Sequence, residues 1–253
     1  MSNYSLLRYP GGKTRAVKLL KEYIPKETKE ICSPFFGGGS FEIYLSLNNI
    51  KVYGYDNFKP LVCFWKSVMN SPIDLHKKVS EYYPLSKNTF YNLQKLIHSF
   101  ENEIEIGAAY YVLNRCSFSG TGLSGGMSLN HPRFTHRQVE NILKFKTIFE
   151  IEILSFEYSI MKHNCLVYAD PPYLIKQALY GNKGNMHKNF DHQKLAEILN
   201  KRNNFILSYN NCDEVKEMYK NHIFLYPEWK YGMSSNKKSN EILIISKDLK
   251  YES

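Results

Sequence analysis

The fold is decided by the stretch CLVYADPPY, which spans residues 165–173. Its first five residues are apolar and two prolines follow closely, so the sequence predicts a buried β-strand that stops at its carboxyl end. In open α/β sheets, ligands bind beyond the carboxyl ends of the strands. Asp170 is therefore expected at the ligand-binding edge of such a sheet.

The tetrapeptide Asp170-Pro171-Pro172-Tyr173 offers three kinds of contact to a planar ring. The prolines have no N–H group, which leaves the carbonyl oxygens of Asp170 and Pro171 able to accept hydrogen bonds from a ligand. The carboxylate is a further acceptor, and Tyr173 supplies a face for stacking. Adenine, with its exocyclic amino group, suits this set. Taken alone, the tetrapeptide is equally compatible with a plain turn after a core strand.

Composition limits the class of protein. The 253 residues suffice for one α/β domain with a smaller insert. A formal net charge of +9 with 15% aromatic residues favours a polyanionic partner, although biased codon usage produces the same pattern. The five cysteines are scattered, so we expect no disulfide framework and no metal site. Neither a leader nor a membrane span is recognised, and a cytoplasmic or nucleoid-associated protein is expected.

A first glycine turn, RYPGGKT at residues 8–14, leads into an expected helix at 16–24. A glycine loop before a helix presents free N–H groups to an anion. Its end is similar to a nucleoside-triphosphate loop, but Leu7 stands where that loop needs glycine, so a nucleoside triphosphatase is excluded. A simple helix-capping turn is the alternative.

A second glycine turn, PFFGGGSF at residues 34–41, follows a predicted strand at 30–33 and starts a helix. This is the first half of a nucleotide-binding βαβ unit. Glu42 stands where the dinucleotide fingerprint has its third glycine, which favours a cofactor without pyrophosphate. The next predicted strand, 51–56, ends in Asp56, an acid suited to ribose hydroxyls. S-adenosylmethionine satisfies all of these features.

Residues 58–149 are expected to form a mainly helical insert. Helices are predicted at 61–69, 75–82, 90–100 and 106–113 from apolar residues at three- and four-residue spacing. A polar, glycine-rich loop follows, flanked by basic and aromatic residues of the kind that hold phosphates and contact bases. The residues assigned to DNA contact in this region are Arg115, Ser119, Arg133 and Arg137. A solvated loop between helices is the alternative, since residues 101–105 are acidic.

The polar segment 174–189 is expected to be a flap over the substrate, and Asp191 is expected to cap the following helix. Strands are predicted at 205–208, 223–226 and 242–245, and a further helix at 213–219. Lys237 and Lys238 are assigned to a second phosphate contact, with a solvated hairpin as the alternative.

Taken in order, these segments resemble the Dam-like family of DNA adenine-N6 methyltransferases. The matching segments are RYPGGK (8–13), PFFGGGS (34–40), YDN (55–57), YVLNR (111–115), DPPY (170–173) and the tail 237–244. The resemblance implies an α/β fold, a Rossmann-like methyltransferase sheet with helices on both faces. It assigns residues 1–57 and 150–253 to the catalytic domain and 58–149 to an inserted, mainly helical target-recognition region.

The resemblance also implies roles. S-adenosylmethionine is the expected cofactor, without a metal, held by Tyr9, Lys13, Phe35, Gly37, Gly39, Asp56 and Asp170. Asp170, Pro171, Pro172 and Tyr173 form the expected catalytic motif. The expected substrate is adenine in double-stranded DNA, flipped out of the stack before methylation. A cognate restriction endonuclease is left open as a further partner.

Two rival functions stay open at this point. One is methylation of adenine in RNA or of the cytosine amino group, although in the family the aspartate-headed tetrapeptide leans towards adenine. The other is a catalytically silent DNA-binding subunit. The intact Lys13, Asp56, Asp170 and Tyr173 count against it, because a silent copy need not keep them.

Overall fold

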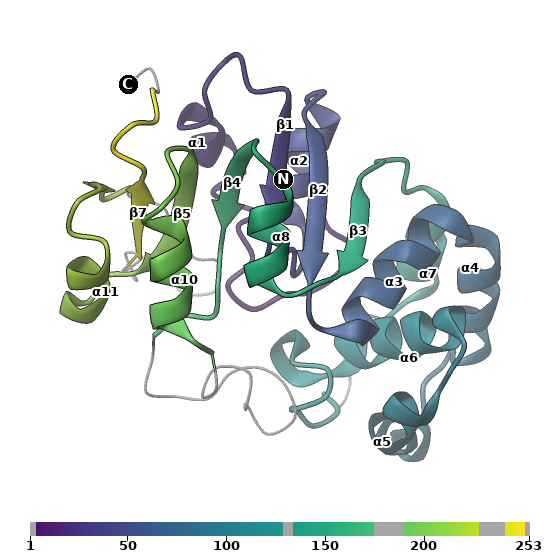
Figure 1. The fold of residues 1–253 in the computed structure, drawn as a ribbon. Helices are drawn as coiled ribbons and strands as arrows, with labels where there is room; N and C mark the ends of the chain where they lie inside the picture. Colours follow the sequence, from purple (N-terminus) through teal and green to yellow (C-terminus); the bar gives the residue numbers. More distant parts are fainter. Residues whose placement is uncertain (1–3, 129–133, 175–189, 228–240, 251–253) are drawn as a thin grey trace.

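The computed structural model describes residues 4–128, 134–174, 190–227 and 241–250, and Figure 1 shows its fold. In this part of the chain a seven-stranded sheet has the order β3-β2-β1-β4-β5-β7-β6. The strands are β1 (Glu30–Ser33), β2 (Lys51–Asp56), β3 (Glu150–Ile153), β4 (Leu166–Ala169), β5 (Phe205–Asn210), β6 (Ile223–Leu225) and β7 (Glu241–Ile245).

The strand order reverses between β1 and β4. β1 pairs in parallel with β2 on one side and with β4 on the other. The chain therefore adds β2 and β3 on one side of β1 and then crosses over to add β4 on the opposite side. Such a reversal opens a crevice at the carboxyl ends of the two strands. The second glycine turn follows β1 and Asp170 follows β4, so both lie at this crevice.

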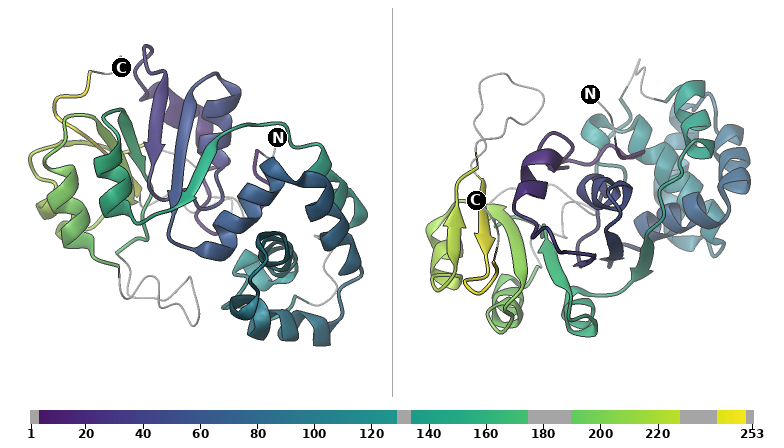
Figure 2. Two further views of the ribbon diagram at one scale, coloured as in Figure 1. Left: turned by 45° about the vertical axis from the view of Figure 1, so that its right-hand side comes forward. Right: turned by 90° about the horizontal axis from the view of Figure 1, so that it is seen from above.

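Helices cover both faces of the sheet (Figure 2). They are α1 (Val17–Glu22) and α2 (Ser40–Leu47) on one face, and α8 (Phe156–Lys162), α10 (His192–Leu199) and α11 (Asp213–Met218) on the other. Alternate strand residues enter two separate hydrophobic clusters: Ile31 and Tyr168 enter the first, Cys32 and Val167 the second. This alternation follows from the two-residue period of a strand buried on both faces. The α/β class and the Rossmann-like sheet are therefore confirmed.

A group of helices lies beyond β3 at one end of the sheet (Figure 1). They are α3 (Lys59–Asn70), α4 (Pro72–Glu81), α5 (Lys87–Leu96), α6 (Glu103–Cys116) and α7 (His136–Leu143), with 3-10 turns η1 (Ile97–Ser99) and η2 (Phe118–Gly120). The four helices predicted here are confirmed, whereas α7 was not predicted.

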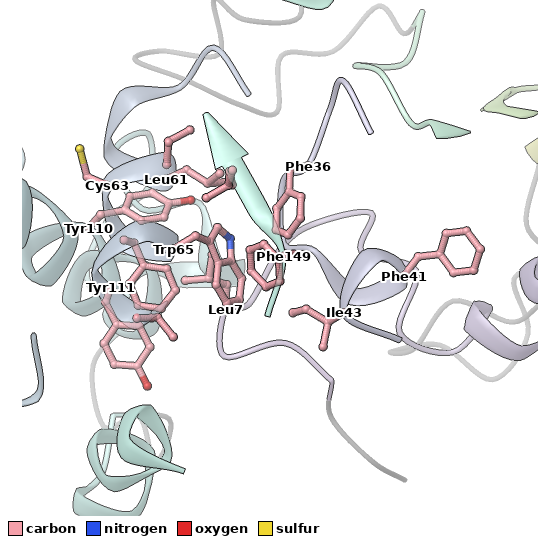
Figure 3. Close-up of a cluster of buried hydrophobic side chains, with 14 of the residues drawn as sticks. Leu7, Phe36, Phe41, Ile43, Leu61, Cys63, Trp65, Tyr110, Tyr111 and Phe149 are labelled. Carbon is pink, nitrogen blue, oxygen red and sulfur yellow. The ribbon is translucent and has the colours of Figure 1, made fainter. Parts of the chain in front are cut away.

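This helical region shares a hydrophobic cluster with the α1 and α2 face of the sheet. Trp65 of α3 packs against Phe36 of the glycine turn and Phe149 before β3, with ring centroids 5.8 and 5.7 Å apart (Figure 3). Because the packing is continuous, the division into a catalytic domain and a separate recognition insert stays a prediction.

Two elements near the crevice were not predicted. Ile151 is the one buried residue of β3, and α8 has only seven residues. Neither segment therefore shows a clear periodic pattern of apolar residues. Asp191 caps α10 as predicted, its carboxylate accepting a hydrogen bond from the Lys194 N–H at 2.8 Å. Among the described helices, none has the length and apolar character needed to cross a membrane.

Candidate active site

A cavity of about 560 Å³ lies at the carboxyl edge of the sheet. It is lined by both glycine turns, by the ends of β2 and β4, and by the start of α8. The expected cofactor and catalytic residues all line it: Tyr9, Lys13, Phe35, Gly37, Gly39, Asp56, Asp170, Pro171, Pro172 and Tyr173. The structure thus brings together segments that are far apart in the sequence, while their individual roles remain proposals.

The second glycine turn is shaped by two aromatic side chains. Gly37 and Gly39 have φ values of +49° and +65°, a region that favours glycine. A Cβ atom at Gly38 would lie 2.6 Å from the Tyr9 Cβ, and one at Gly39 would lie 2.4 Å from the Phe36 Cε1. Gly37 and Gly38 therefore allow the two turns to pack directly against each other, and Gly39 makes room for Phe36 of its own turn.

Asp56 fixes this turn to the end of β2. Its Oδ2 accepts a hydrogen bond from the Gly37 N–H at 3.0 Å, and its Oδ1 accepts one from the Phe58 N–H at 2.9 Å. Burial raises the pKa of Asp56 to about 6, although these hydrogen bonds oppose the rise. Since each carboxylate oxygen has two lone pairs, Asp56 retains acceptor capacity for the ribose hydroxyls that the sequence suggested.

The Asp170 carboxylate lies in a network of charged and hydroxyl groups. Lys13 Nζ lies 2.8 Å from both of its oxygens, 2.9 Å from the Tyr173 hydroxyl and 3.7 Å from Glu241 Oε1. The Tyr173 hydroxyl donates a hydrogen bond to Glu241 Oε1 at 2.5 Å. Burial raises the pKa of Asp170; Lys13 lowers it and Glu241 raises it further. Sequence reasoning missed Glu241, which arrives from a strand distant in the chain.

The other end of the cavity is aromatic. The rings of Phe35, Phe156 and Phe190 lie 5.3–5.6 Å apart, and all three residues line the cavity. Glu157 lines it too, and its buried Oε2 atom has no hydrogen-bond partner. A flat ring bearing an N–H donor could pack against this aromatic cluster and donate to Glu157. Phe156 and Glu157 were missed because β3, which leads to them, was not predicted.

Glu42 is a further carboxyl group beside the second glycine turn. It is buried at the start of α2, lines the cavity, and accepts a hydrogen bond from the Ser33 hydroxyl at 2.8 Å. Burial raises the pKa of Glu42 to about 7, and nearby Asp170 adds to the rise. From the sequence, Glu42 was interpreted only as the residue in place of a third glycine, which favours a cofactor without pyrophosphate.

The residues assigned to DNA contact fall into three groups. Ser119, in η2, and Arg137, on α7, are exposed. Arg115 is only 6% exposed, and its guanidinium lies 3.5 Å from the Leu6 carbonyl oxygen. Its assignment to phosphate contact is therefore corrected: its apolar neighbours on α6 turn it into the protein. Arg133, Lys237 and Lys238 lie outside the described residues, as does the expected flap from residue 175 to 189.

Asn114 ties the exposed loop to the first glycine turn. Its side-chain amide donates to the carbonyl oxygens of Arg8 and Gly120 at 2.7 and 2.9 Å, and its Oδ1 accepts from the Arg8 N–H at 2.9 Å. One buried side chain thus joins the segment before Tyr9 to the loop that contains Ser119.

A mixed, mainly parallel sheet with a glycine turn and a DPPY tetrapeptide at its switch point defines an α/β protein of the methyltransferase class. The chain belongs to the D12 class N6 adenine-specific DNA methyltransferase family, whose model matches residues 9–233. It is therefore an adenine-specific DNA methyltransferase, as its resemblance to the Dam-like family implied. No cluster of three or more potential metal ligands occurs among the residues that the structure describes.

Individual relatives agree with this assignment. The type II methyltransferase M.CviBI of Paramecium bursaria Chlorella virus NC1A is 23% identical over 240 residues, or 89% of this chain and 90% of the relative. The type II methyltransferase M.MjaIII of Methanocaldococcus jannaschii is 26% identical over 196 residues, 66% of this chain and 68% of the relative. The modification methylase LlaI of Lactococcus lactis subsp. lactis is 24% identical over 214 residues, 78% of this chain but only 34% of that longer protein.

Proposed function

We propose that this enzyme transfers the methyl group of S-adenosylmethionine to the exocyclic N6 of an adenine flipped out of duplex DNA. The observation that carries the proposal is that the Asp170-Pro171-Pro172-Tyr173 tetrapeptide and both glycine turns line one cavity of about 560 Å³. The cavity is lined by acceptors for an amino group and by an aromatic cluster.

The residues present fit such a methyl donor. The aromatic surface formed by Phe35, Phe156 and Phe190 suits its purine, and the unpartnered Glu157 Oε2 suits the amino group of that purine. Asp56, at the end of β2, is available for the ribose. When bound, the donor supplies a methyl group carried on a positively charged sulfur.

Asp170 has the main task in activating the target base. In free adenine the N6 lone pair is delocalised into the ring, so N6 attacks a methyl carbon only when that lone pair is drawn out of conjugation. Hydrogen bonds from N6–H to the Asp170 carboxylate and the Pro171 carbonyl oxygen would achieve this. They strengthen as positive charge develops on nitrogen, and so they lower the barrier.

Tyr173 would hold the base for in-line attack. One face of its ring lies towards Tyr209, with centroids 5.9 Å apart and planes inclined by 24°. Its hydroxyl is anchored by Glu241 and Lys13. A ring held at its hydroxyl and on one side is already oriented before substrate arrives, which lowers the entropic cost of positioning the base.

Base flipping and DNA binding follow from access and charge. The N6 atom of a stacked adenine cannot reach a carboxylate at the base of a cavity, so the nucleotide must leave the helix. The net charge of +9 and the exposed Arg137 support a duplex partner. Basic side chains would hold the phosphates of the DNA backbone that is strained when the base leaves the helix. The names of the relatives also leave room for a cognate restriction endonuclease.

Product analysis tests this proposal. The protein is incubated with labelled S-adenosylmethionine and duplex DNA free of adenine methylation, and the DNA is digested to nucleosides. The expected product is N6-methyldeoxyadenosine. Label in N4-methyldeoxycytidine, or only in an RNA substrate, would support the amino-methylation alternatives, and label in no nucleic acid would support a silent subunit.

The variant Asp170→Ala tests the role proposed for Asp170. Asp248→Ala is its control, because Asp248 is an exposed acid outside the cavity. Asp170→Ala is expected to lower the rate of methyl transfer at least about 100-fold, the usual cost of removing a group that stabilises charge in the transition state. Asp248→Ala should keep the normal rate. Near-normal turnover by Asp170→Ala, measured in single-turnover assays, would remove the proposed role.

A further inference from the structure

Two carboxylates share Lys13, which lines the cavity together with Asp170. Lys13 Nζ lies 2.8 Å from both Asp170 oxygens and 3.7 Å from Glu241 Oε1. The Lys13 side chain is 4% exposed and that of Glu241 is 6% exposed. Tyr173 bridges the lysine and Glu241: its hydroxyl lies 2.9 Å from Lys13 Nζ and donates to Glu241 at 2.5 Å.

This arrangement conflicts with the chemistry proposed for Asp170. The carboxylate keeps lone pairs that can accept a hydrogen bond from the target amino group, but both of its oxygens contact the positively charged Lys13 ammonium. The amino nitrogen becomes positive during attack, and the donor sulfur starts out positive. An ammonium group held on Asp170 would repel both charges across a poorly screened site. Lys13 therefore has to move away from Asp170 before methyl transfer.

We propose that Glu241 is a positioning residue that takes over the Lys13 ammonium when Asp170 engages the target amino group. This inference rests on the proposed function. The exchange keeps the lysine charge paired, which matters because an unpaired charge in a buried site is strongly destabilising. It also leaves the full negative charge of Asp170 to act on the nitrogen that becomes positive.

The topology explains how Glu241 reaches this position. β7 runs antiparallel to β5, with Glu241 opposite Asn210. The first residue of β7 thus lies at the edge where the parallel strands β4 and β5 end. A carboxylate from β7 therefore reaches Lys13 at the same edge of the sheet as Asp170.

Tyr173 makes the exchange compatible with a fixed base-binding face. Its hydroxyl contacts Lys13, Asp170 and Glu241, with Ser208 at 3.4 Å, so it keeps an acidic partner whichever carboxylate holds the lysine. The ring orientation is then maintained while the ammonium moves. Beyond these neighbours, Glu42 is the other acid whose charge interacts with Asp170.

Glu241→Gln tests the proposal, because it removes the charge that receives Lys13 but keeps nearly the same shape. Single-turnover methylation is expected to slow by about 10- to 100-fold, the range for one charge-assisted contact. Dissociation constants for the donor and for duplex DNA should stay within about twofold of wild type, a change too small to be resolved as a lost contact. Glu241→Asp should recover part of the rate. Glu217→Gln, an exposed acid on α11, serves as the matched control.

The pH profile separates positioning from a merely structural role. Glu241 raises the pKa of Asp170, so Glu241→Gln should move the acid limb of the rate profile to lower pH. Loss of a purely structural contact would lower the melting temperature and weaken both binding constants without moving this limb. If Glu241→Gln fails to fold, the position of Lys13 in the wild-type complex with donor analogue and duplex DNA decides the question.

A structure of the complex with a donor analogue and duplex DNA gives a direct readout. Lys13 Nζ is expected closer to Glu241 than to Asp170. Three results would overturn the proposal: Lys13 still within about 3 Å of both Asp170 oxygens in that complex, an unchanged single-turnover rate in Glu241→Gln, or an unshifted acid limb. Failure of the wild-type protein to methylate adenine is a separate result that removes the proposed function itself.

Discussion

Glu42 brings a carboxyl group into the interior beside the second glycine turn, where its pKa rises to about 7 from an ordinary value of 4.5. A raised pKa means that the folded state binds the proton more tightly than the unfolded state. The resulting stabilisation is complete below the unfolded pKa and is lost as the pH rises through the folded pKa. Glu42 therefore makes the protein less stable above neutrality.

We predict that Glu42→Gln removes this pH dependence, because glutamine keeps the hydrogen bond from Ser33 without titrating. Relative to wild type, the free energy of unfolding of the variant should rise by up to about 3 kcal/mol between about pH 5 and pH 8. Asp56 titrates in both proteins, so it cancels from the difference. Urea unfolding at the two pH values measures the effect, with Glu217→Gln as control. A difference independent of pH would contradict the role given to Glu42.

At the level of single residues, the sequence predicted part of the candidate site. Asp170, Tyr173 and Asp56 were identified because each follows an apolar run that predicts a strand. Lys13 was found through its glycine turn, but its ion pair with Asp170, 157 residues away, is a property of the folded chain. Glu241 had no local signal, since its position depends on the antiparallel register of β7.

The second glycine turn is the element on which the cavity depends most. Gly39 combines a φ of +65° with a Cβ position only 2.4 Å from the Phe36 ring. Phe36 is itself buried against Trp65 and Phe149, so it cannot move aside. Gly122 has a similar φ of +59°, but the nearest atom to its Cβ position lies 3.9 Å away.

These two glycines allow backbone strain and steric overlap to be separated. Gly122→Ala should cost about 1 kcal/mol of stability, because only the left-handed backbone opposes it. Gly39→Ala should cost about 1–3 kcal/mol more, the usual penalty for overpacking a filled core, and should weaken donor binding. Urea unfolding and donor titration measure both effects. Equal losses in the two variants would mean that Phe36 yields and that the turn is less constrained than its geometry indicates.

The prediction of helices and strands succeeded where the sequence has long or regularly spaced runs of apolar residues. β1, β2, β4 and β5 are buried over most of their length, and four helices of the helical region carry apolar residues at regular spacing. β3 is an edge strand with one buried residue, and α7 has eight residues of which two are buried. Short elements of this kind are fixed by their neighbours in space and give little periodic signal.

The whole molecule carries a formal net charge of +9, and exposed Arg137 lies on α7 in the helical region at one end of the sheet. For each phosphate that a cation neutralises, the slope of log K against log salt changes by about 0.9. Arg137→Ala is therefore expected to weaken duplex binding and to flatten that slope by about one unit.

Lys220→Ala is the control, because Lys220 is 63% exposed and already pairs with Glu217. It follows α11, which lies at the other end of the sheet (Figure 1). Its salt slope should equal that of the wild type. Binding isotherms at several salt concentrations provide the measurement. If Arg137→Ala also keeps the wild-type slope, Arg137 makes no phosphate contact and the duplex lies elsewhere on the surface.

Asn114 connects two loops, so that a movement of one loop would displace the other. Because a single amide clasps Arg8 and Gly120, displacement of the outer loop by a nucleic acid would be transmitted to the segment that precedes Tyr9 and Lys13. Binding of the nucleic acid would then change the affinity for the methyl donor. Thermodynamic linkage requires that the donor change the affinity for the nucleic acid by the same factor. The sign of this coupling would follow from whether the displaced loop moves Tyr9 and Lys13 towards the cavity or away from it.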